Sequence, residues 1–141
     1  MSKIQRLVLA ALRLVTGWYF FYAGLLKIID PKWSAAPFLK SAQMFPHFYQ
    51  WFALPSVLPW VNLANEWGLL LLGLSLILGL WLKWTAPAGI VLMFLYYFGS
   101  VNFPHAGPNA LVVDEHILLV ATLLVLWFFR AGSFWGLERR R

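Results

Sequence analysis

Long apolar stretches follow one another along this chain, with short polar stretches between them. A helix of about 20 mainly apolar residues crosses the hydrocarbon core of a bilayer. Four stretches have about that length, so the pattern predicts membrane-spanning helices over residues 4–29, 61–82, 84–101 and 112–130. Pro87, near the start of the third stretch, fits a first helical turn, where the amide has no helical partner. The sequence therefore predicts an all-α, integral membrane four-helix bundle, with residues 1–141 as one domain.

The connection over residues 30–60 differs from an ordinary loop. It is rich in proline and in aromatic side chains, among them Trp33, Phe38, Tyr49 and Trp60. Long loops in compact proteins are mostly functional or disordered, and this one is too aromatic for disorder. Because aromatic rings favour the membrane–water interface, we predict an ordered segment with short helices. It lies on the outer membrane surface and covers that end of the bundle.

The basic residues give the predicted bundle a direction. With four spans, Lys27, Lys32 and Lys40 fall on one side of the membrane. Seven others fall on the opposite side: Lys3, Arg6, Lys83, Arg130, Arg139, Arg140 and Arg141. Cytoplasmic loops carry the excess of Lys and Arg, so both termini are predicted to be cytoplasmic. The formal net charge of +6 then reflects membrane orientation, and we expect no nucleic-acid partner.

The composition indicates that lipid is the main surrounding of this chain. Charged residues make up 11% and hydrophobic residues 62%, whereas about 25% of an ordinary soluble domain is charged. There is no cysteine, which excludes disulfides, thiolate nucleophiles and thiolate-ligated iron–sulfur clusters. The N-terminal run is similar to a signal peptide, but Arg13 interrupts it and no small-residue cleavage site precedes Lys27. We therefore predict a retained helix.

Polar side chains from separate parts of the sequence meet at the outer end of the predicted bundle. They are Lys27, Asp30, Asn62, Asn65, Glu66, Asn102, His105, Asn109, Asp114, Glu115 and His116. A structural interpretation is available for several of them: an acid in a first helical turn gains about 0.3–1 kcal/mol from the helix dipole. On that interpretation Asn62 or Asn109 caps a helix, and Asp114 and Glu115 lie among hydrated head groups.

Glu66 and His116 favour a functional interpretation. An ionisable residue at the centre of a span costs about 2.5–3.5 kcal/mol and usually faces a partner or a watery cavity. We predict that Lys27, Glu66 and His116 share one pocket, with Lys27 reaching Glu66 and with Asn62 and Asn65 beside them. Successive helical residues point about 100° apart, so only one of Asp114 and Glu115 accompanies His116, and the sequence leaves both open.

The first predicted helix carries a stripe of small and basic residues on one face. Gly17 and Gly24 are expected to let a neighbouring helix approach closely. Arg13 lies on the same stripe. It either snorkels toward the inner surface or contributes to substrate binding.

Two stretches resemble the DoxX/DoxD family. They are "LRLVTGWYFFYAGLLKIID" over residues 12–30 and "NLANEWGLLLLGLSLILGL" over residues 62–80. The residues that match the family pattern are Arg13, Gly17, Ala23, Gly24 and Lys27 in the first and Glu66, Gly68 and Gly73 in the second. The start of the last span, "DEHILLVATLL", is similar to that of many members. The resemblance implies a multi-pass protein of the cytoplasmic (inner) membrane of bacteria or archaea. Some members are subunits of thiosulfate:quinone oxidoreductase.

Two functional hypotheses follow. In the first, the chain is an oxidoreductase subunit that passes electrons from a small sulfur substrate or a partner subunit to quinone. Catalysis is assigned to Glu66, His116 and Lys27, and substrate binding to Asn62, Asn65, Arg13, Asp114 and Glu115. Quinone is the one cofactor expected, because the histidines show no spacing typical of metal or haem ligands. In the second, the chain is a non-enzymatic scaffold or small transporter. Both hypotheses allow a homodimer.

Overall fold

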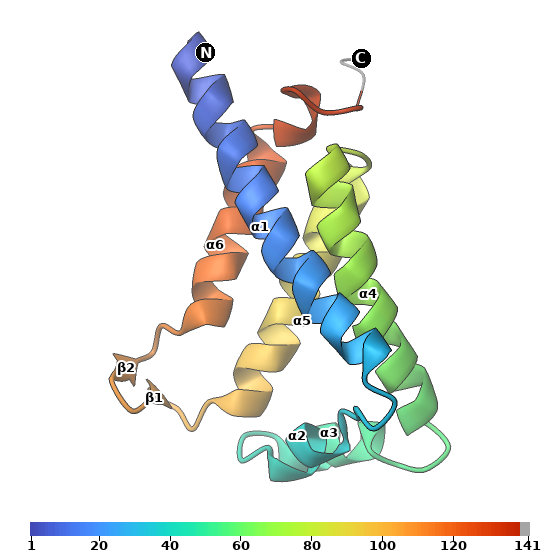
Figure 1. The fold of residues 1–141 in the computed structure, drawn as a ribbon. Coiled ribbons are helices and arrows are strands. Elements are labelled where there is room, and N and C mark those ends of the chain that lie inside the picture. The colour runs from blue at the N-terminus through green and yellow to red at the C-terminus, as the bar shows by residue number, and fades with distance from the viewer. Residues whose placement is uncertain (139–141) are drawn as a thin grey trace.

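Helices form most of the chain in the computed structural model, which describes residues 1–138. The four longer helices run alternately in opposite directions (Figure 1). They are α1 (Lys3–Ile29), α4 (Leu58–Leu78), α5 (Leu82–Ser100) and α6 (Glu115–Phe128). The most extensive contacts join α1 to α4 and α5 to α6. A core of Leu, Phe, Met and Val side chains lies between the four helices.

Two of these helices, α1 and α4, are long and apolar enough to cross a membrane. Helix α6 is apolar but has 14 residues, which at 1.5 Å per residue reach about 21 Å, less than the roughly 30 Å of a hydrocarbon core. That all four helices span the bilayer therefore stays a prediction.

The helix ends differ from the predicted ends for identifiable reasons. Helix α4 ends at Leu78 because Gly79 adopts a left-handed conformation with φ 64°, which is the common helix-ending geometry. Helix α5 then begins at Leu82, so Pro87 lies inside the helix. The expectation that Pro87 occupies the first turn is wrong.

Residues 30–57 form an ordered layer across one end of the bundle (Figure 1). This layer contains α2 (Ala36–Ser41) and α3 (Pro46–Phe52), and its own small core includes Leu39 and Tyr49. The Tyr49 hydroxyl donates a hydrogen bond of 2.6 Å to the carbonyl oxygen of Leu95 in α5, and burial raises the pKa of this phenol. The expected short helices are therefore confirmed, whereas contact of the layer with a membrane surface stays a prediction.

A two-stranded antiparallel hairpin connects α5 to α6. It consists of β1 (His105–Gly107) and β2 (Ala110–Leu111), a short exception that the sequence did not predict in an otherwise helical fold. Pro104 and Pro108 interrupt helix formation on either side of β1, and Asn109 lies in the hairpin turn. Neither Asn62 nor Asn109 is a helix cap, because the N-cap residues of α4 and α6 are Val57 and Asp114.

Close contact between α1 and α4 depends on glycine. A Cβ atom on Gly24 would lie 2.4 Å from the backbone nitrogen of Leu70, and one on Gly17 would lie 2.9 Å from that of Ile77. Gly73 of α4 has an equally close approach to Phe21 of α1. The expected close packing at Gly17 and Gly24 is confirmed.

The start of α1 and the segment that follows α6, as far as residue 138, lie at the end of the bundle opposite the α2–α3 layer (Figure 1). We call this the terminal end, and the end covered by the layer the loop end. Lys3, Arg6, Lys83 and Arg130 belong to segments at the terminal end, as the charge pattern predicts. Arg139, Arg140 and Arg141 lie outside the described residues, and which end faces the cytoplasm stays a prediction.

Arg13 is almost fully buried, with 1% of its surface exposed, and it anchors the segment after α6. Its guanidinium donates to the carbonyl oxygens of Ala131 at 2.9 Å, Phe134 at 3.2 Å and Trp135 at 3.2 Å. Carbonyl groups near a helix C-terminus lack intrahelical donors. The Arg13 guanidinium supplies N–H donors to the carbonyl groups after α6. The snorkelling interpretation of Arg13 is therefore wrong, because the side chain does not reach the surface. Its contribution to substrate binding stays a prediction.

Candidate functional site

A cavity of about 530 Å³ lies at the loop end, between the α2–α3 layer and the four longer helices. Its walls are mainly apolar and include the aromatic side chains of Trp33, Phe38, Tyr49, Phe52 and Tyr96. The polar residues Lys27, Asn65 and His116 also line it. An apolar cavity with a few convergent polar groups is the usual form of a small-molecule site.

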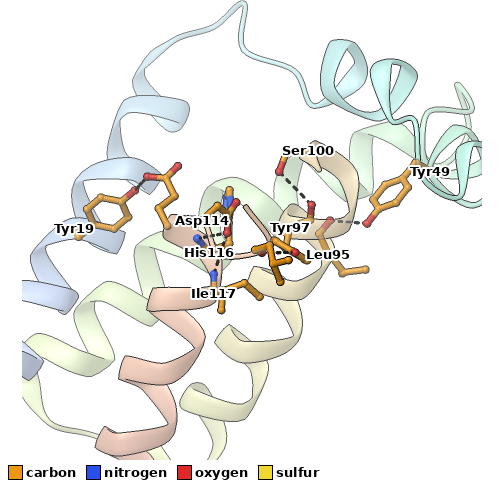
Figure 2. Close-up of polar contacts among 10 residues, drawn as sticks. Tyr19, Tyr49, Leu95, Tyr97, Ser100, Asp114, His116 and Ile117 are labelled. Carbon is orange, nitrogen blue, oxygen red and sulfur yellow. Dashed lines mark hydrogen bonds and ion pairs between the residues drawn. The ribbon is translucent and has the colours of Figure 1, made fainter. Parts of the chain in front are cut away.

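His116 is held in place by the residue that begins its helix. Asp114 is the N-cap of α6, and its Oδ1 accepts hydrogen bonds from the backbone nitrogens of His116 at 2.9 Å and Ile117 at 3.1 Å. The second carboxylate oxygen lies 2.7 Å from Nδ1 of His116 (Figure 2). Asp114, rather than Glu115, is therefore the carboxylate partner of His116.

This pairing fixes the chemistry of the imidazole. A carboxylate at Nδ1 holds a proton there, so Nε2 is the nitrogen that accepts or releases a second proton. Among residues 1–138 the structure shows no partner for Nε2 of His116. The imidazole therefore has one nitrogen available to a molecule in the cavity.

Tyr96 and Asn65 support the His116 ring. The rings of Tyr96 and His116 meet edge to face, with centroids 5.8 Å apart and an interplanar angle of 75°. The Tyr96 hydroxyl donates to Oδ1 of Asn65, and Nδ2 of Asn65 donates to the carbonyl oxygen of Val61 at 2.7 Å. The amide oxygen of Asn65 thus holds Tyr96, while its amide nitrogen is fixed to the preceding turn of α4. Sequence reasoning missed Tyr96, although a tyrosine within an apolar helix signals a hydroxyl that needs a partner.

Lys27 occupies the last turn of α1, at the edge of the cavity. Its Nζ lies 4.7 Å from the centroid of the Trp33 ring, which is a cation–π geometry. Among residues 1–138, the one ion pair present joins His116 to Asp114. The predicted contact between Lys27 and Glu66 is therefore wrong.

Glu66 does not line the cavity. It is partly buried, and its side chain forms no hydrogen bond or ion pair within the described part of the chain. The reason is helical geometry: Asn65 faces the cavity, and the next residue points about 100° away from it. The predicted grouping of Lys27, Glu66 and His116 is thus correct for Lys27 and His116 and wrong for Glu66.

Asn62 and Glu115 do not line the cavity. Each instead joins its helix to a neighbouring element. Oδ1 of Asn62 accepts a hydrogen bond of 2.9 Å from the backbone nitrogen of Ala35, just before α2. Oε2 of Glu115 accepts a hydrogen bond of 3.2 Å from the Tyr19 hydroxyl in α1 (Figure 2). Both residues therefore stabilise the arrangement of elements around the site.

No group of three or more His, Cys, Asp or Glu side chains suited to a metal ion occurs within residues 1–138. The acidic and imidazole groups at the loop end instead form one pair, Asp114 with His116. Proton exchange at His116 is the chemistry that this pair supports.

Comparison with known proteins assigns the family. No curated protein and no solved structure shows significant similarity to the chain. The DoxX family profile matches residues 8–102, which takes in α1 to α5 and stops before α6. Because this match spans more than half of the sequence, the chain belongs to the DoxX family of membrane proteins.

Proposed function

We propose that this chain is the membrane subunit of an oxidoreductase and that the loop-end cavity takes the head group of a quinone. One observation carries the proposal: His116, already paired with a carboxylate, faces an apolar cavity walled by five aromatic side chains. Flat rings pack well against aromatic walls. A quinone carbonyl oxygen is an acceptor, and the exchangeable proton on Nε2 of His116 matches it.

The proposed reaction at this site is the reduction of quinone to quinol, which consumes two electrons and two protons. The imidazolium of His116 donates one proton from Nε2 to a quinone oxygen as electrons arrive, and water supplies the second proton to the other oxygen. Asp114 stabilises the charged ring and fixes its orientation. Lys27 places an ammonium group at the edge of the cavity, where it offsets negative charge on the reduced oxygen. Glu66 takes no part, since it lies outside the lining.

The electrons come from a small sulfur compound or from a partner subunit. Two thiosulfate ions, for example, form one sulfur–sulfur bond between them and release two electrons, which balances the quinone step. We place the protein in the cytoplasmic membrane of a prokaryote as a four-span bundle with both termini inside. The orientation is supported by Lys3, Arg6, Lys83 and Arg130, which belong to segments at one and the same end of the bundle.

The test compares two variants after co-purification from membranes in mild detergent, so that a partner subunit is retained. Quinone reduction with thiosulfate is measured together with binding of a short-chain ubiquinone analogue. His116→Ala should lower turnover by about 100-fold, as expected for loss of a general acid, while the analogue still binds. Glu66→Gln, the matched control, should retain full turnover.

Equal turnover in the His116→Ala variant and the native protein would contradict the proton role. Absence of analogue binding to the native complex would contradict quinone as the ligand. That second result would favour a non-enzymatic scaffold or a small transporter.

A further inference from the structure

A second and larger cavity, of about 1070 Å³, lies at the terminal end. Its lining comes from the turn between α4 and α5, from the last turn of α6 and from the segment that follows α6. This cavity shares no lining residue with the loop-end cavity. It is therefore a separate candidate site.

Within the described residues, two cations line this terminal-end cavity, and they come from different elements. Lys83 belongs to the first turn of α5, and Arg130 follows α6. Both side chains are exposed, and neither forms an ion pair with any residue between positions 1 and 138. Among residues 1–138, Glu138 is the one carboxylate in the lining. The lining residues within that part of the chain therefore carry a net charge of about +1 at neutral pH.

The remaining walls are apolar and aromatic. Trp81 and Leu137 are largely exposed, with 70% and 64% of their surfaces accessible. Trp127 is a residue of α6 and lines the cavity from that helix. Tryptophan is enriched where a membrane protein meets the head-group region. Exposed apolar side chains beside two cations suit a ligand with an anionic head and an apolar tail.

Buried Arg13 builds one wall of this site. Its hydrogen bonds to Ala131, Phe134 and Trp135 fix the segment that carries Phe134 and Leu137 into the lining. The backbone nitrogens of Leu137 and Glu138 also donate to Leu78 and Gly79 at 2.9 Å each. The wall is thus fixed by α1 and α4 before any ligand binds, and the guanidinium adds positive potential behind it.

We propose that the terminal-end cavity binds one anionic phospholipid, with its phosphate between Lys83 and Arg130 and its acyl chains along the apolar walls. Basic pockets between membrane helices bind anionic lipid head groups in this way. Phosphatidylglycerol, with one negative charge, matches the net charge of the lining. This site is independent of the proposed quinone chemistry at the loop end.

The experiment uses the full chain in nanodiscs of equal parts phosphatidylglycerol and phosphatidylcholine. After mild detergent extraction, native mass spectrometry counts each phospholipid retained per protein. The native protein should retain phosphatidylglycerol in preference to phosphatidylcholine. A basic residue near an anionic head group contributes about fivefold in affinity, so Lys83→Ala with Arg130→Ala should weaken retention by about 25-fold.

Two further variants make the test specific. Lys32→Ala with Lys40→Ala removes the same charge from the loop end and should leave retention unchanged. Glu138→Gln removes the one carboxylate of the lining and should tighten phosphatidylglycerol binding, a gain that a misfolded protein would not show. Equal retention of both lipids by the native protein, no loss in the Lys83 and Arg130 variant, or no gain with Glu138→Gln would overturn the proposal.

Discussion

At the loop end, Lys27 and His116 face a cavity with aromatic walls, whereas at the terminal end Arg13 is surrounded by backbone carbonyls. Nε2 of His116 has no partner among residues 1–138, while the guanidinium of Arg13 donates to the carbonyl oxygens of four residues, Ala131, Gly132, Phe134 and Trp135. Both terminal nitrogens of the Arg13 guanidinium have partners within the protein, although Nε has none among residues 1–138. A buried charge held by such contacts holds the fold together. An ionisable group that keeps a position open to a cavity is available for chemistry.

Of the substitutions considered, that of Arg13 should lower the stability of the protein most, through the loss of contacts at the terminal end. Arg13→Ala removes the hydrogen bonds that the guanidinium donates to the segment after α6, and we expect a loss of about 3 kcal/mol in the free energy of unfolding. This free energy is measured by unfolding the protein in mixed micelles with an increasing fraction of denaturing detergent. Arg13→Lys, which keeps the charge but reaches fewer carbonyls, should lose less.

The same variants sharpen the comparison between the two ends. Because Arg13 fixes a wall of the terminal-end cavity, Arg13→Ala should also reduce phosphatidylglycerol retention, whereas quinone-analogue binding at the loop end should persist. Stability equal to that of the native protein would show that the guanidinium contacts contribute nothing net. Loss of both ligands together would show that the two ends are not independent.

Tyr96→Phe should have a smaller effect, confined to the loop end. It keeps the ring beside His116 but removes the hydroxyl that satisfies Oδ1 of Asn65, at a cost of about 1 kcal/mol in the free energy of unfolding. Turnover with quinone should fall by less than about tenfold through kcat, with KM unchanged, because the ring still positions His116. A changed KM would indicate that Tyr96 contacts the quinone directly.

The sequence predicts the elements better than it predicts their partners. Apolar runs locate the four longer helices, and Gly17 and Gly24 identify the face of α1 that packs on α4. The turn at Gly79 and the hairpin before α6 were missed, because a single left-handed residue or a short strand pair leaves little trace in an apolar pattern.

The candidate site was predicted in part. His116 and Lys27 are at the loop end because the alternating helix directions place them there. Whether Asn65 or Glu66 faces the cavity depends on the rotation of α4 about its axis, which packing sets and which no local pattern shows. The partners of Arg13 lie more than 100 residues away along the chain, so no spacing rule could identify them.

The central claim, that a quinone head group occupies the loop-end cavity, is tested most directly by photo-crosslinking. A short-chain azido-quinone is activated by light on the purified membrane complex, and the labelled peptides are identified by mass spectrometry. We predict labels on residues that line the loop-end cavity, chiefly Trp33, Tyr96 and His116, and their loss when excess unlabelled quinone is present. Labels confined to the terminal-end cavity, or labels that excess quinone does not displace, would contradict the claim.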